Sequence, residues 1–441
     1  MVVMDENQNY FNNVNVPQPV APPRKERGGG KGLFFAGLAT GLAVALLIAA
    51  VGYIGFGVQN ALEQRGSSQS GSGKVELEED SAIDTDTVRK LQTLEETINR
   101  YFFLHDVTDE EMQDGLFKGL LASLGDPYSE YYTKEELDSM LEQSEGIYFG
   151  IGAYVQLDEI TGLPKISGVI EGSPAEEAEL RANDLIYEVD GASTVGLNLT
   201  EATALIKGPE GTEVELTLLR EGESDYMTLT LTRRRVESPT VEFSMLEDDM
   251  AYIQVTEFDD VTVNQFANAL DSARTSGAKG IILDLRGNPG GNLDAVVDMC
   301  AMILPEGMIV YTEDKYGHRE EYTCDGEHEL ELPLTVLVDM NSASAAEIMA
   351  GAIKDYGIGT LVGTTTFGKG IVQQIMSFRD GSAVKITISA YYTPNGNNIH
   401  GIGIVPDVVC EFDGEAYYGS EDHPDNQLEK AKEVLREQMK K

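Results

Sequence analysis

The chain has 441 residues and carries 75 acidic against 32 basic side chains, which gives a formal net charge of −43 at pH 7. This charge argues against nucleic acid as a partner, because phosphate binding requires a basic face. The length is enough for roughly two to four domains, each with its own core. Three widely spaced cysteines, Cys300, Cys324 and Cys410, indicate neither a disulfide framework nor a paired-cysteine metal site.

The N-terminal part of the chain predicts a membrane anchor. Residues 1–32 are rich in Asn, Pro and Gly, and we expect a disordered tail there. Residues 33–58 contain no charged side chain, and a helix of this length spans a hydrocarbon core of ~30 Å. We therefore expect a transmembrane helix, because the stretch is too long for the apolar part of a cleaved signal peptide. Basic residues precede it and acidic residues dominate after it, so the positive-inside rule predicts a cytoplasmic N-terminus, with the rest of the chain outside the cell membrane.

Two helices are expected between the membrane span and the first globular domain. Residues 59–82 combine Gly, Ser and acidic residues, which is typical of a flexible linker. Within the helical segment 83–145, apolar side chains recur at helical spacing over 87–103 and 109–124. The run Gly125, Asp126, Pro127 ends the second helix, because Pro disfavours a helical conformation in the residue before it.

Residues 146–236 alternate apolar and polar side chains as short strands, with two short helices among them. A Gly-containing loop is expected at 148–152, and this order of elements resembles a PDZ domain. The resemblance implies that backbone N–H groups of Phe149, Gly150, Ile151 and Gly152 bind the C-terminal carboxylate of a peptide that adds a strand to the sheet. Alternatively, these glycines only form a tight turn.

From residue 237 to 441 strands and helices alternate, which indicates an α/β core that ends in a C-terminal helix. Strands are expected at 251–255 and 280–285, and helices at 263–273, 293–303 and 426–440. The segment 286–291 (RGNPGG) lies between a strand and a helix. It is neither a Walker loop nor a dinucleotide fingerprint, because no GK[ST] follows and the glycine spacing differs. Its glycines allow backbone N–H groups to converge on a small anion, and a plain turn is the alternative.

The stretch 334–374 carries the strongest chemical signal. An apolar run at 334–339 predicts a buried strand, and the Ala, Met and Ile content of 345–356 predicts a packed helix. Ser344 therefore lies on a strand-to-helix turn, where unpaired N–H groups and the helix dipole favour an oxyanion. The alternative is an ordinary capping box with Glu347. A second strand is expected over 363–373, with Lys369 and Gln373 on one face.

Together, the segments 341–347 (NSASAAE) and 366–373 (TFGKGIVQ) resemble the Ser–Lys signature of the C-terminal processing peptidases, also called tail-specific proteases. The resemblance implies that Ser344 is the nucleophile, Lys369 the general base and Gln373 the residue that orients the lysine amine. The family often has a second Ser where this chain has Ala346, a position outside the Ser–Lys pair. Segments 124–132 and 401–407 also resemble the family, so the resemblance covers roughly residues 87–413.

The same resemblance implies the remaining parts of the site. The oxyanion hole would combine the N–H of Ala345 with that of Gly290 or Gly291. Lys369 must be neutral to act as a base, and lowering its pKa from ~10.4 to about 7 or 8 costs ~4 kcal/mol, which requires burial away from carboxylates. No cofactor or metal is required. The sequence leaves open the substrate, the effect of the PDZ domain on activity and the oligomeric state, a homo-oligomer included.

Other functions compete with this interpretation. None of the five histidines has HExxH spacing, which argues against a metalloprotease. A Ser-His-Asp hydrolase would need His400, which lies in an expected loop. An acyl-CoA-handling enzyme on the same kind of core would need a basic nucleotide-binding patch, and the sequence offers none. The last alternative is a catalytically inactive PDZ-containing adaptor or receptor on the cell surface, and the intact Ser344, Lys369 and Gln373 argue against it.

We therefore predict a multidomain α+β protein with an N-terminal transmembrane helix, a helical segment, a PDZ domain and an α/β (crotonase-like) serine protease core. Its expected function is that of a membrane-anchored serine endopeptidase. The expected substrates are proteins or peptides that are cleaved near their C-termini, after the PDZ domain has recognised the terminus.

Overall fold

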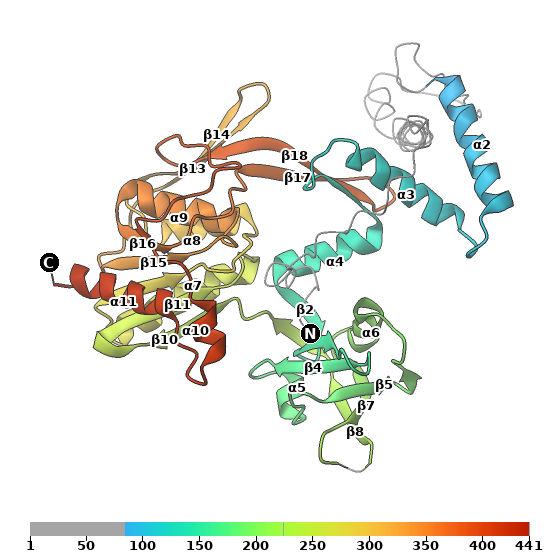
Figure 1. The fold of residues 1–441 in the computed structure, drawn as a ribbon, viewed down its shortest axis with the longest axis horizontal. Helices are drawn as coiled ribbons and strands as arrows, with labels where there is room; N and C mark the ends of the chain where they lie inside the picture. The colour runs from blue at the N-terminus through green and yellow to red at the C-terminus, as the bar shows by residue number, and fades with distance from the viewer. Residues whose placement is uncertain (1–83, 224, 441) are drawn as a thin grey trace, which may run out of the picture. The chain divides into compact units, whose positions relative to one another are not determined.

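The computed structural model describes residues 84–223 and 225–440, and Figure 1 shows its helices and strands. The described residues form two compact units. The first unit consists of residues 141–370 and 390–440, and the second of residues 84–140 and 371–389. The predicted tail, transmembrane helix and linker at 1–82 lie outside the described residues. In the part of the chain that is described, none of the helices is both long and apolar enough to cross a membrane.

The second unit contains both helices that the apolar spacing predicts. α2 (Thr85–Tyr101) begins after Asp84, whose carboxylate caps the first turn. α3 (Asp109–Ala122) begins with a reciprocal capping box between Thr108 and Glu111. Both helices are thus started by side chains that accept otherwise unpaired N–H groups, which confirms the two predicted helices.

A small set of strands completes the second unit. β1 (Glu130–Tyr132) pairs antiparallel with β18 (Ala383–Tyr392), and β17 (Ile371–Ser377) also pairs with β18. The chain passes from this unit into the first one along α4 (Lys134–Glu145). Segments that are far apart in the sequence therefore share one unit.

Residues 147–237 of the first unit form a β-rich domain. Its strands form a sheet in the order β3-β4-β5-β7-β8, with β6 beside β5, while β2 pairs with β9. The helix α6 (Leu199–Ile206) begins with a capping box between Asn198 and Glu201. The core of this domain is apolar, and Ile166, Ile186 and Leu216 are fully buried in it. The elements are β2 (Ile147–Gly150), β3 (Ala153–Leu157), β4 (Pro164–Val169), α5 (Pro174–Glu177), β5 (Leu185–Val189), β6 (Ala192–Ser193), α6, β7 (Glu213–Leu219), β8 (Met227–Thr232) and β9 (Arg234–Glu237).

The rest of the first unit is built on a six-stranded sheet in the order β10-β11-β12-β15-β16-β19. β10 runs antiparallel to β11, and every later neighbour in this sheet is parallel. The alternation of strands and helices that the sequence predicts is therefore confirmed. The elements are β10 (Val241–Met245), η2 (Glu247–Asp249), β11 (Met250–Val255), α7 (Asp260–Thr275), β12 (Gly280–Asp284), α8 (Leu293–Ala301), β13 (Gly307–Asp314), β14 (Arg319–Cys324), β15 (Leu334–Val338), α9 (Ala345–Tyr356), β16 (Gly359–Gly363), β19 (Val408–Val409), α10 (Gly414–Gly419) and α11 (Asn426–Gln438).

The sheet is covered on both faces. β12 is buried along its whole length, a pattern typical of a parallel strand between two layers. Ile281 and Leu283 meet Phe266 of α7 around a small apolar cavity, whereas Ile282 packs in one cluster with Leu435 of α11. Because side chains alternate along a strand, α7 and α11 must lie on opposite faces.

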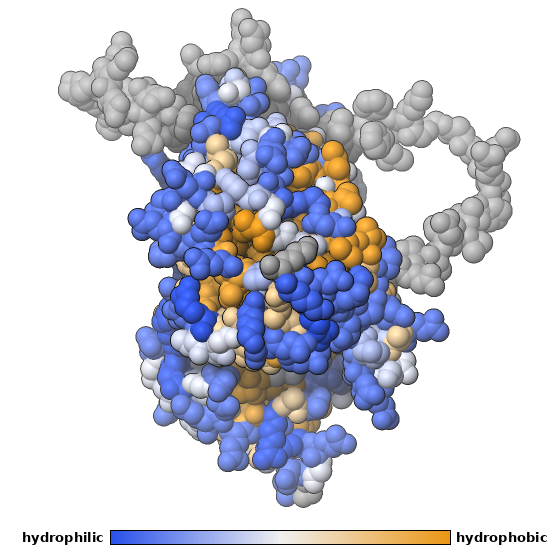
Figure 2. Space-filling view, turned by 90° about the vertical axis from the view of Figure 1, so that its left-hand side faces the viewer, coloured by the Kyte–Doolittle hydropathy of each residue, from blue (hydrophilic) through white to orange (hydrophobic). Residues whose placement is uncertain are grey.

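The parallel strands bring the candidate functional segments to one edge of the sheet. Residues 286–291 follow β12, Ser344 follows β15 by six residues, and Lys369 follows β16 by six residues. The carboxyl ends of parallel strands lie at the same edge, where α/β proteins commonly place their sites. Figure 2 shows a molecular face that is mostly hydrophilic with a few apolar patches, as expected from the many charged residues.

We expect replacement of Leu435 by Ala to destabilise the six-stranded sheet. Leu435 is fully buried, and a Cβ built on Gly280 of β12 would lie 2.9 Å from Leu435 Cδ1, so the helix and the strand are tightly packed. Truncating a buried Leu to Ala costs ~2–5 kcal/mol of unfolding free energy. Urea denaturation followed by circular dichroism should show a lower midpoint, while the exposed Glu437→Ala on the same helix should shift the free energy by less than about 0.5 kcal/mol. An unchanged midpoint for Leu435→Ala would contradict this packing.

Candidate active site

Ser344 occupies a strained turn between β15 and α9. Its backbone lies at φ 53° and ψ −115°, a region that non-glycine residues rarely adopt and that clusters at functional sites. The turn is fixed by Ser342, whose hydroxyl donates to the Leu285 carbonyl (2.8 Å) and accepts the Asp339 N–H (2.9 Å). The predicted strand-to-helix position of Ser344 is therefore confirmed.

Glu347, in the first turn of α9, is completely buried and accepts four hydrogen bonds. Its carboxylate receives the N–H groups of Ser344 (3.0 Å), Gly368 (2.7 Å) and Lys369 (2.8 Å) and the hydroxyl of Thr366 (2.5 Å). The capping alternative is also observed, because Ser344 and Glu347 form a capping box in which Glu347 accepts the Ser344 N–H. One buried carboxylate holds the backbones of Ser344 and Lys369.

Lys369 lies in a loop, and the predicted strand over 363–373 is wrong for this part of the chain. β16 ends at Gly363 and β17 begins at Ile371. The reason is that the N–H groups of Gly368 and Lys369 are donated to Glu347, so they are not available for a neighbouring strand. Lys369 is half-buried in this loop. Because side chains alternate between two faces only in a strand, the prediction that Lys369 and Gln373 share one face does not apply.

A second segment covers the Lys369 loop from the other side. The Gly401 N–H donates to the Gly368 carbonyl (2.8 Å), and the Ile404 N–H donates to the Thr366 hydroxyl (2.7 Å). The segment 401–407, which resembles the peptidase family in sequence, therefore has a structural role at the site. His400, directly before this segment, is exposed and lies in a turn, in agreement with its predicted place in a loop.

The glycine loop 286–291 packs directly against Ser344. A Cβ on Gly290 would lie 2.7 Å from Ser344 Cβ and 2.9 Å from the Ala345 nitrogen, so only glycine fits there. The Gly290 N–H donates to Asn288 Oδ1 (2.8 Å) and is therefore not available as an oxyanion donor in this structure. Among the hydrogen bonds of residues 84–223 and 225–440, the N–H groups of Gly291 and Ala345 have no acceptor. Of the two glycines predicted for this role, Gly291 is the one whose N–H has no acceptor among the described residues.

Tyr391 is a site residue that sequence reasoning missed. It is buried, its hydroxyl donates to the Ser344 carbonyl (3.1 Å), and its N–H donates to the Gly370 carbonyl (3.1 Å). Burial, together with the charge of Glu347, raises the pKa of Tyr391 well above its ordinary value. Tyr391 therefore stays protonated and acts as a donor. The residues around Tyr391 alternate as in a strand, and this pattern predicts only that Tyr391 is an aromatic side chain in the core.

Gln373 belongs to the second unit, on β17, and it is hydrogen-bonded to β18 in that unit. Its amide donates to the Thr387 hydroxyl (3.2 Å), which in turn donates to Asp126 Oδ2 (2.7 Å). The Ser129 hydroxyl donates to the same Asp126 oxygen (2.6 Å). The segment 124–132 is thus joined to β17 and β18 through a polar network.

The predicted carboxylate-binding loop is shorter than expected. Phe149 and Gly150 lie in β2 and pair with Arg235 and Arg234 of β9, so only Ile151 and Gly152 form the turn before β3. The carbonyls of Ile151 and Gly152 accept N–H groups from Ala175 (2.7 Å) and Ile170 (2.9 Å). The N–H groups of Ile151 and Gly152 have no acceptor among the described residues, so they can bind an anion.

Two acids follow β11, the half-buried Glu257 and the buried Asp259, in a loop that is bonded to the glycine loop. Burial raises the pKa of Glu257, and burial together with the neighbouring charge of Glu257 raises the pKa of Asp259 to about 8. Phe258 lies between them and is bonded to the glycine loop, because its N–H donates to the Gly290 carbonyl (2.9 Å). Asp259, whose pKa lies in the neutral range, is therefore the direct neighbour of Phe258, which is bonded to the glycine loop.

Family models match three parts of the chain. Residues 249–410 match peptidase family S41, and residues 165–220 match the PDZ domain. Residues 46–136 match the N-terminal domain of the activating protease CtpB.

Sequence relatives cover most of the described chain. The carboxy-terminal processing protease CtpA of Bacillus subtilis is 40% identical over 305 residues, which cover 69% of this chain and 65% of that protein. The carboxyl-terminal-processing protease of Synechocystis is 38% identical over 297 residues, which cover 66% of this chain and 69% of that protein. The chain belongs to the C-terminal processing peptidases of family S41. This peptidase thus aligns with about two thirds of the length of each of these relatives.

A solved structure gives a weaker likeness. The photosystem II D1 C-terminal processing protease is 30% identical, with a TM-score of 0.43, over 73% of this chain and 86% of that protein. The family assignment of this peptidase therefore rests on the sequence matches.

We expect Glu347→Ala to release the Lys369 loop. The substitution leaves the N–H groups of Ser344, Gly368 and Lys369 without their acceptor, and each buried unpaired donor costs ~1–3 kcal/mol. Amide hydrogen exchange at Gly368 and Lys369 should accelerate strongly. Thr366→Val, which removes only one of the four donors, serves as the graded control and should have a smaller effect. Unchanged exchange in Glu347→Ala would mean that the loop is held by other contacts.

We expect Asp259→Asn to change how stability depends on pH. The folded pKa of about 8 exceeds the unfolded value of ~3.9, so the unfolded state loses its proton first and folding stability falls as the pH rises between these values. The Asn variant cannot titrate and should gain stability relative to the parent as the pH rises from about 4 to 8. Urea midpoints measured across this range test the expectation, with the exposed Asp271→Asn on α7 as control. Parallel pH profiles for parent and Asp259→Asn would refute it.

Proposed function

We propose that this chain is a serine endopeptidase that cleaves protein substrates near their C-termini through a Ser–Lys acyl-enzyme mechanism. The observation that carries the proposal is the buried Glu347 carboxylate, which binds the backbones of Ser344 and Lys369 at once. A nucleophile and a base need fixed relative positions, and a shared anchor supplies this constraint at the level of the backbone. Membership of the family supports the same activity.

The mechanism follows from the roles of the side chains. The Ser344 hydroxyl attacks the scissile carbonyl carbon while the neutral Lys369 amine takes its proton. The carbonyl electrons move onto oxygen, and the N–H groups of Ala345 and Gly291 stabilise that oxyanion. When the tetrahedral intermediate collapses, the C–N bond breaks and the Lys369 ammonium protonates the leaving amine. Water, activated by Lys369, then hydrolyses the Ser344 ester.

The proposal makes a specific demand on electrostatics. A carboxylate close to the Lys369 amine would favour the charged form and keep the pKa high. Glu347 is the buried acid that binds the Lys369 backbone, and its oxygens already accept four hydrogen bonds. The amine must therefore be directed away from Glu347, and we assign Gln373 the role of orienting it, as the family resemblance implies.

The PDZ domain supplies recognition of the substrate terminus in this proposal. The N–H groups of Ile151 and Gly152 are open to a carboxylate. β3 follows directly after them and is an edge strand, because it pairs with β4 alone in its sheet. An extended peptide can add to that edge while its C-terminal carboxylate binds at the turn.

We assign the enzyme to the cell membrane as a single-pass protein. This part of the proposal is supported by the uncharged residues 33–58, which are long enough to span a bilayer, and by the basic residues before them. The N-terminus is then cytoplasmic and the catalytic domain extracytoplasmic. The substrates are proteins or peptides available outside the cytoplasm.

We expect Ser344→Ala and Lys369→Ala each to abolish peptide hydrolysis. Residues that act as one catalytic unit lose about 10⁴-fold or more of kcat when either is removed. The assay is cleavage of an unstructured peptide with a free C-terminus, followed by mass spectrometry of the fragments. Ser276→Ala and Lys279→Ala, an exposed Ser and an exposed Lys between α7 and β12, are the matched controls and should retain full activity.

The same peptide with an amidated C-terminus completes the test. Without the terminal carboxylate, the PDZ domain loses its ligand and cleavage should slow. Hydrolysis that is unchanged in both active-site variants would exclude the peptidase proposal. Binding of the free-terminus peptide by the parent protein without any hydrolysis would favour the PDZ-containing adaptor instead.

A further inference from the structure

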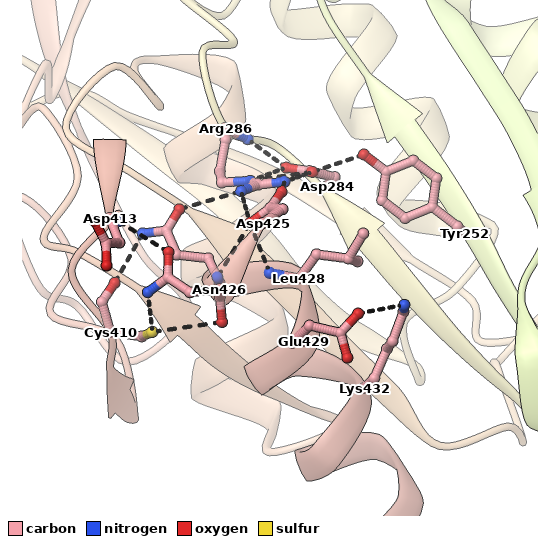
Figure 3. A network of polar contacts seen from close by, with 11 residues as sticks. Tyr252, Asp284, Arg286, Cys410, Asp413, Asp425, Asn426, Leu428, Glu429 and Lys432 are labelled. Atoms are coloured by element: carbon pink, nitrogen blue, oxygen red, sulfur yellow. Dashed lines mark hydrogen bonds and ion pairs between the residues drawn. The ribbon is translucent and has the colours of Figure 1, made fainter. Parts of the chain in front are cut away.

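A half-buried arginine, Arg286, begins the glycine loop, and the mechanism above gives it no role. Figure 3 shows Arg286 in a network of polar contacts between the end of β12 and the start of α11. The guanidinium binds both carboxylate oxygens of Asp284, at 2.5 Å from Nη2 to Oδ2 and 3.0 Å from Nε to Oδ1. Asp284 also accepts the Tyr252 hydroxyl (2.8 Å). One side of the guanidinium is therefore bound to the strand from which the loop emerges.

The other side of the guanidinium is bound by the C-terminal helix. Arg286 Nη1 donates to Asp425 Oδ1 (3.1 Å) and Gln427 Oε1 (3.1 Å), and Nη2 lies 2.8 Å from Asp425 Oδ2. Although burial opposes ionisation of Asp425, the hydrogen bond from Arg286 helps to hold the pKa of this carboxyl below its usual range. The arginine thus bridges two carboxylates that lie 141 positions apart in the chain (425 − 284).

The helix end that supplies Asp425 is itself fixed. Asp425 caps α11, accepting the N–H groups of Gln427 (3.0 Å) and Leu428 (2.9 Å). The Gln427 amide donates to the Cys410 carbonyl (2.7 Å), and the Asn426 amide donates to the Glu411 carbonyl (2.8 Å). Further along α11, Leu435 is buried with Ile282 of β12. The first turn of α11 is therefore fixed by several hydrogen bonds, and Arg286 binds to this fixed turn.

The position of Arg286 matters because the loop that follows it touches the nucleophile. Gly287 donates its N–H to Asp339 (3.0 Å), and the Asn288 carbonyl accepts the Ala343 N–H (2.9 Å). Gly290 then packs on Ser344, and the N–H of Gly291 is the proposed oxyanion donor. If Arg286 moves, the loop that follows it moves as well, and the distance between the Gly291 N–H and the oxyanion changes. This distance controls the rate.

We infer that Asp425 is a positioning residue for peptide hydrolysis, which acts through Arg286 on the oxyanion loop. This inference rests on the proposed function. It gives the C-terminal helix a part in the reaction, in addition to its part in covering the sheet. The carboxylate of Asp425 has two separable tasks, to cap α11 and to hold Arg286.

Asp425→Asn separates the two tasks. Asn is as good an N-cap residue as Asp, so the helix start is retained, while the charge that binds Arg286 is lost. Asp413→Asn is the matched control, because Asp413 caps α10 through the Ala416 N–H (2.9 Å) and its carboxylate forms no ion pair with an arginine among the described residues. Both variants are made in the full chain.

The experiment measures kcat and KM on the free-terminus peptide, with the concentration of active sites titrated by a fluorophosphonate that labels Ser344. We expect Asp425→Asn to lower kcat per active site by roughly tenfold with KM changed less than twofold, because the lost contact positions donors for the transition state. Asp413→Asn should keep the parental kcat. Placing Asp425→Asn in an Arg286→Gln background should cause little further loss, since the partner is already absent.

The outcomes are distinguishable from each other. A kcat per active site within twofold of the parent overturns the inference, as does a loss seen only in the number of active sites, which would assign Asp425 a structural role alone. Additive losses in the double variant overturn the route through Arg286. A parent protein that neither hydrolyses peptides nor reacts with the fluorophosphonate would overturn the proposed function, and this inference with it, before any variant is made.

Discussion

The site depends on one buried carboxylate. Glu347 has no exposed surface, and burying an ionised acid is costly unless hydrogen bonds compensate for the lost water. Four donors compensate here, and three of them are backbone N–H groups of Ser344, Gly368 and Lys369. The carboxylate therefore requires these segments to stay together, because separating any one of them would leave a buried charge with an empty acceptor site. The relative position of the Ser344 and Lys369 backbones follows from this requirement.

The sequence was informative where a local pattern decides the structure. The apolar run of β15 and the start of α9 put Ser344 on a strand-to-helix turn, and the alternation of strands and helices predicted the α/β core. The strand expected through Lys369 was wrong because its N–H groups are bound by Glu347, 22 positions earlier in the chain. A pattern of side chains cannot reveal that a distant carboxylate takes the backbone donors of a strand-like segment.

The supports of the site that the sequence did not predict are all long-range contacts. Tyr391 reaches the Ser344 carbonyl from 47 positions away, and Asp425 reaches Arg286 from 139 positions away. From the local sequence alone, Tyr391 is interpreted as an aromatic residue in a strand and Asp425 as a helix cap. The fold gives each of them a second, distant hydrogen-bond partner. The local sequence does not predict this second partner, because it depends on which remote segments the fold brings together.

These supports share one physical property, which is that they act on the backbone around Ser344. Glu347 accepts the Ser344 N–H, Tyr391 donates to the Ser344 carbonyl, and Arg286 begins the loop that packs against Ser344. Because Glu347 accepts the backbone N–H of Ser344, the turn is held through its main chain. The strain at Ser344, with its positive φ, is therefore balanced by the surrounding polar contacts.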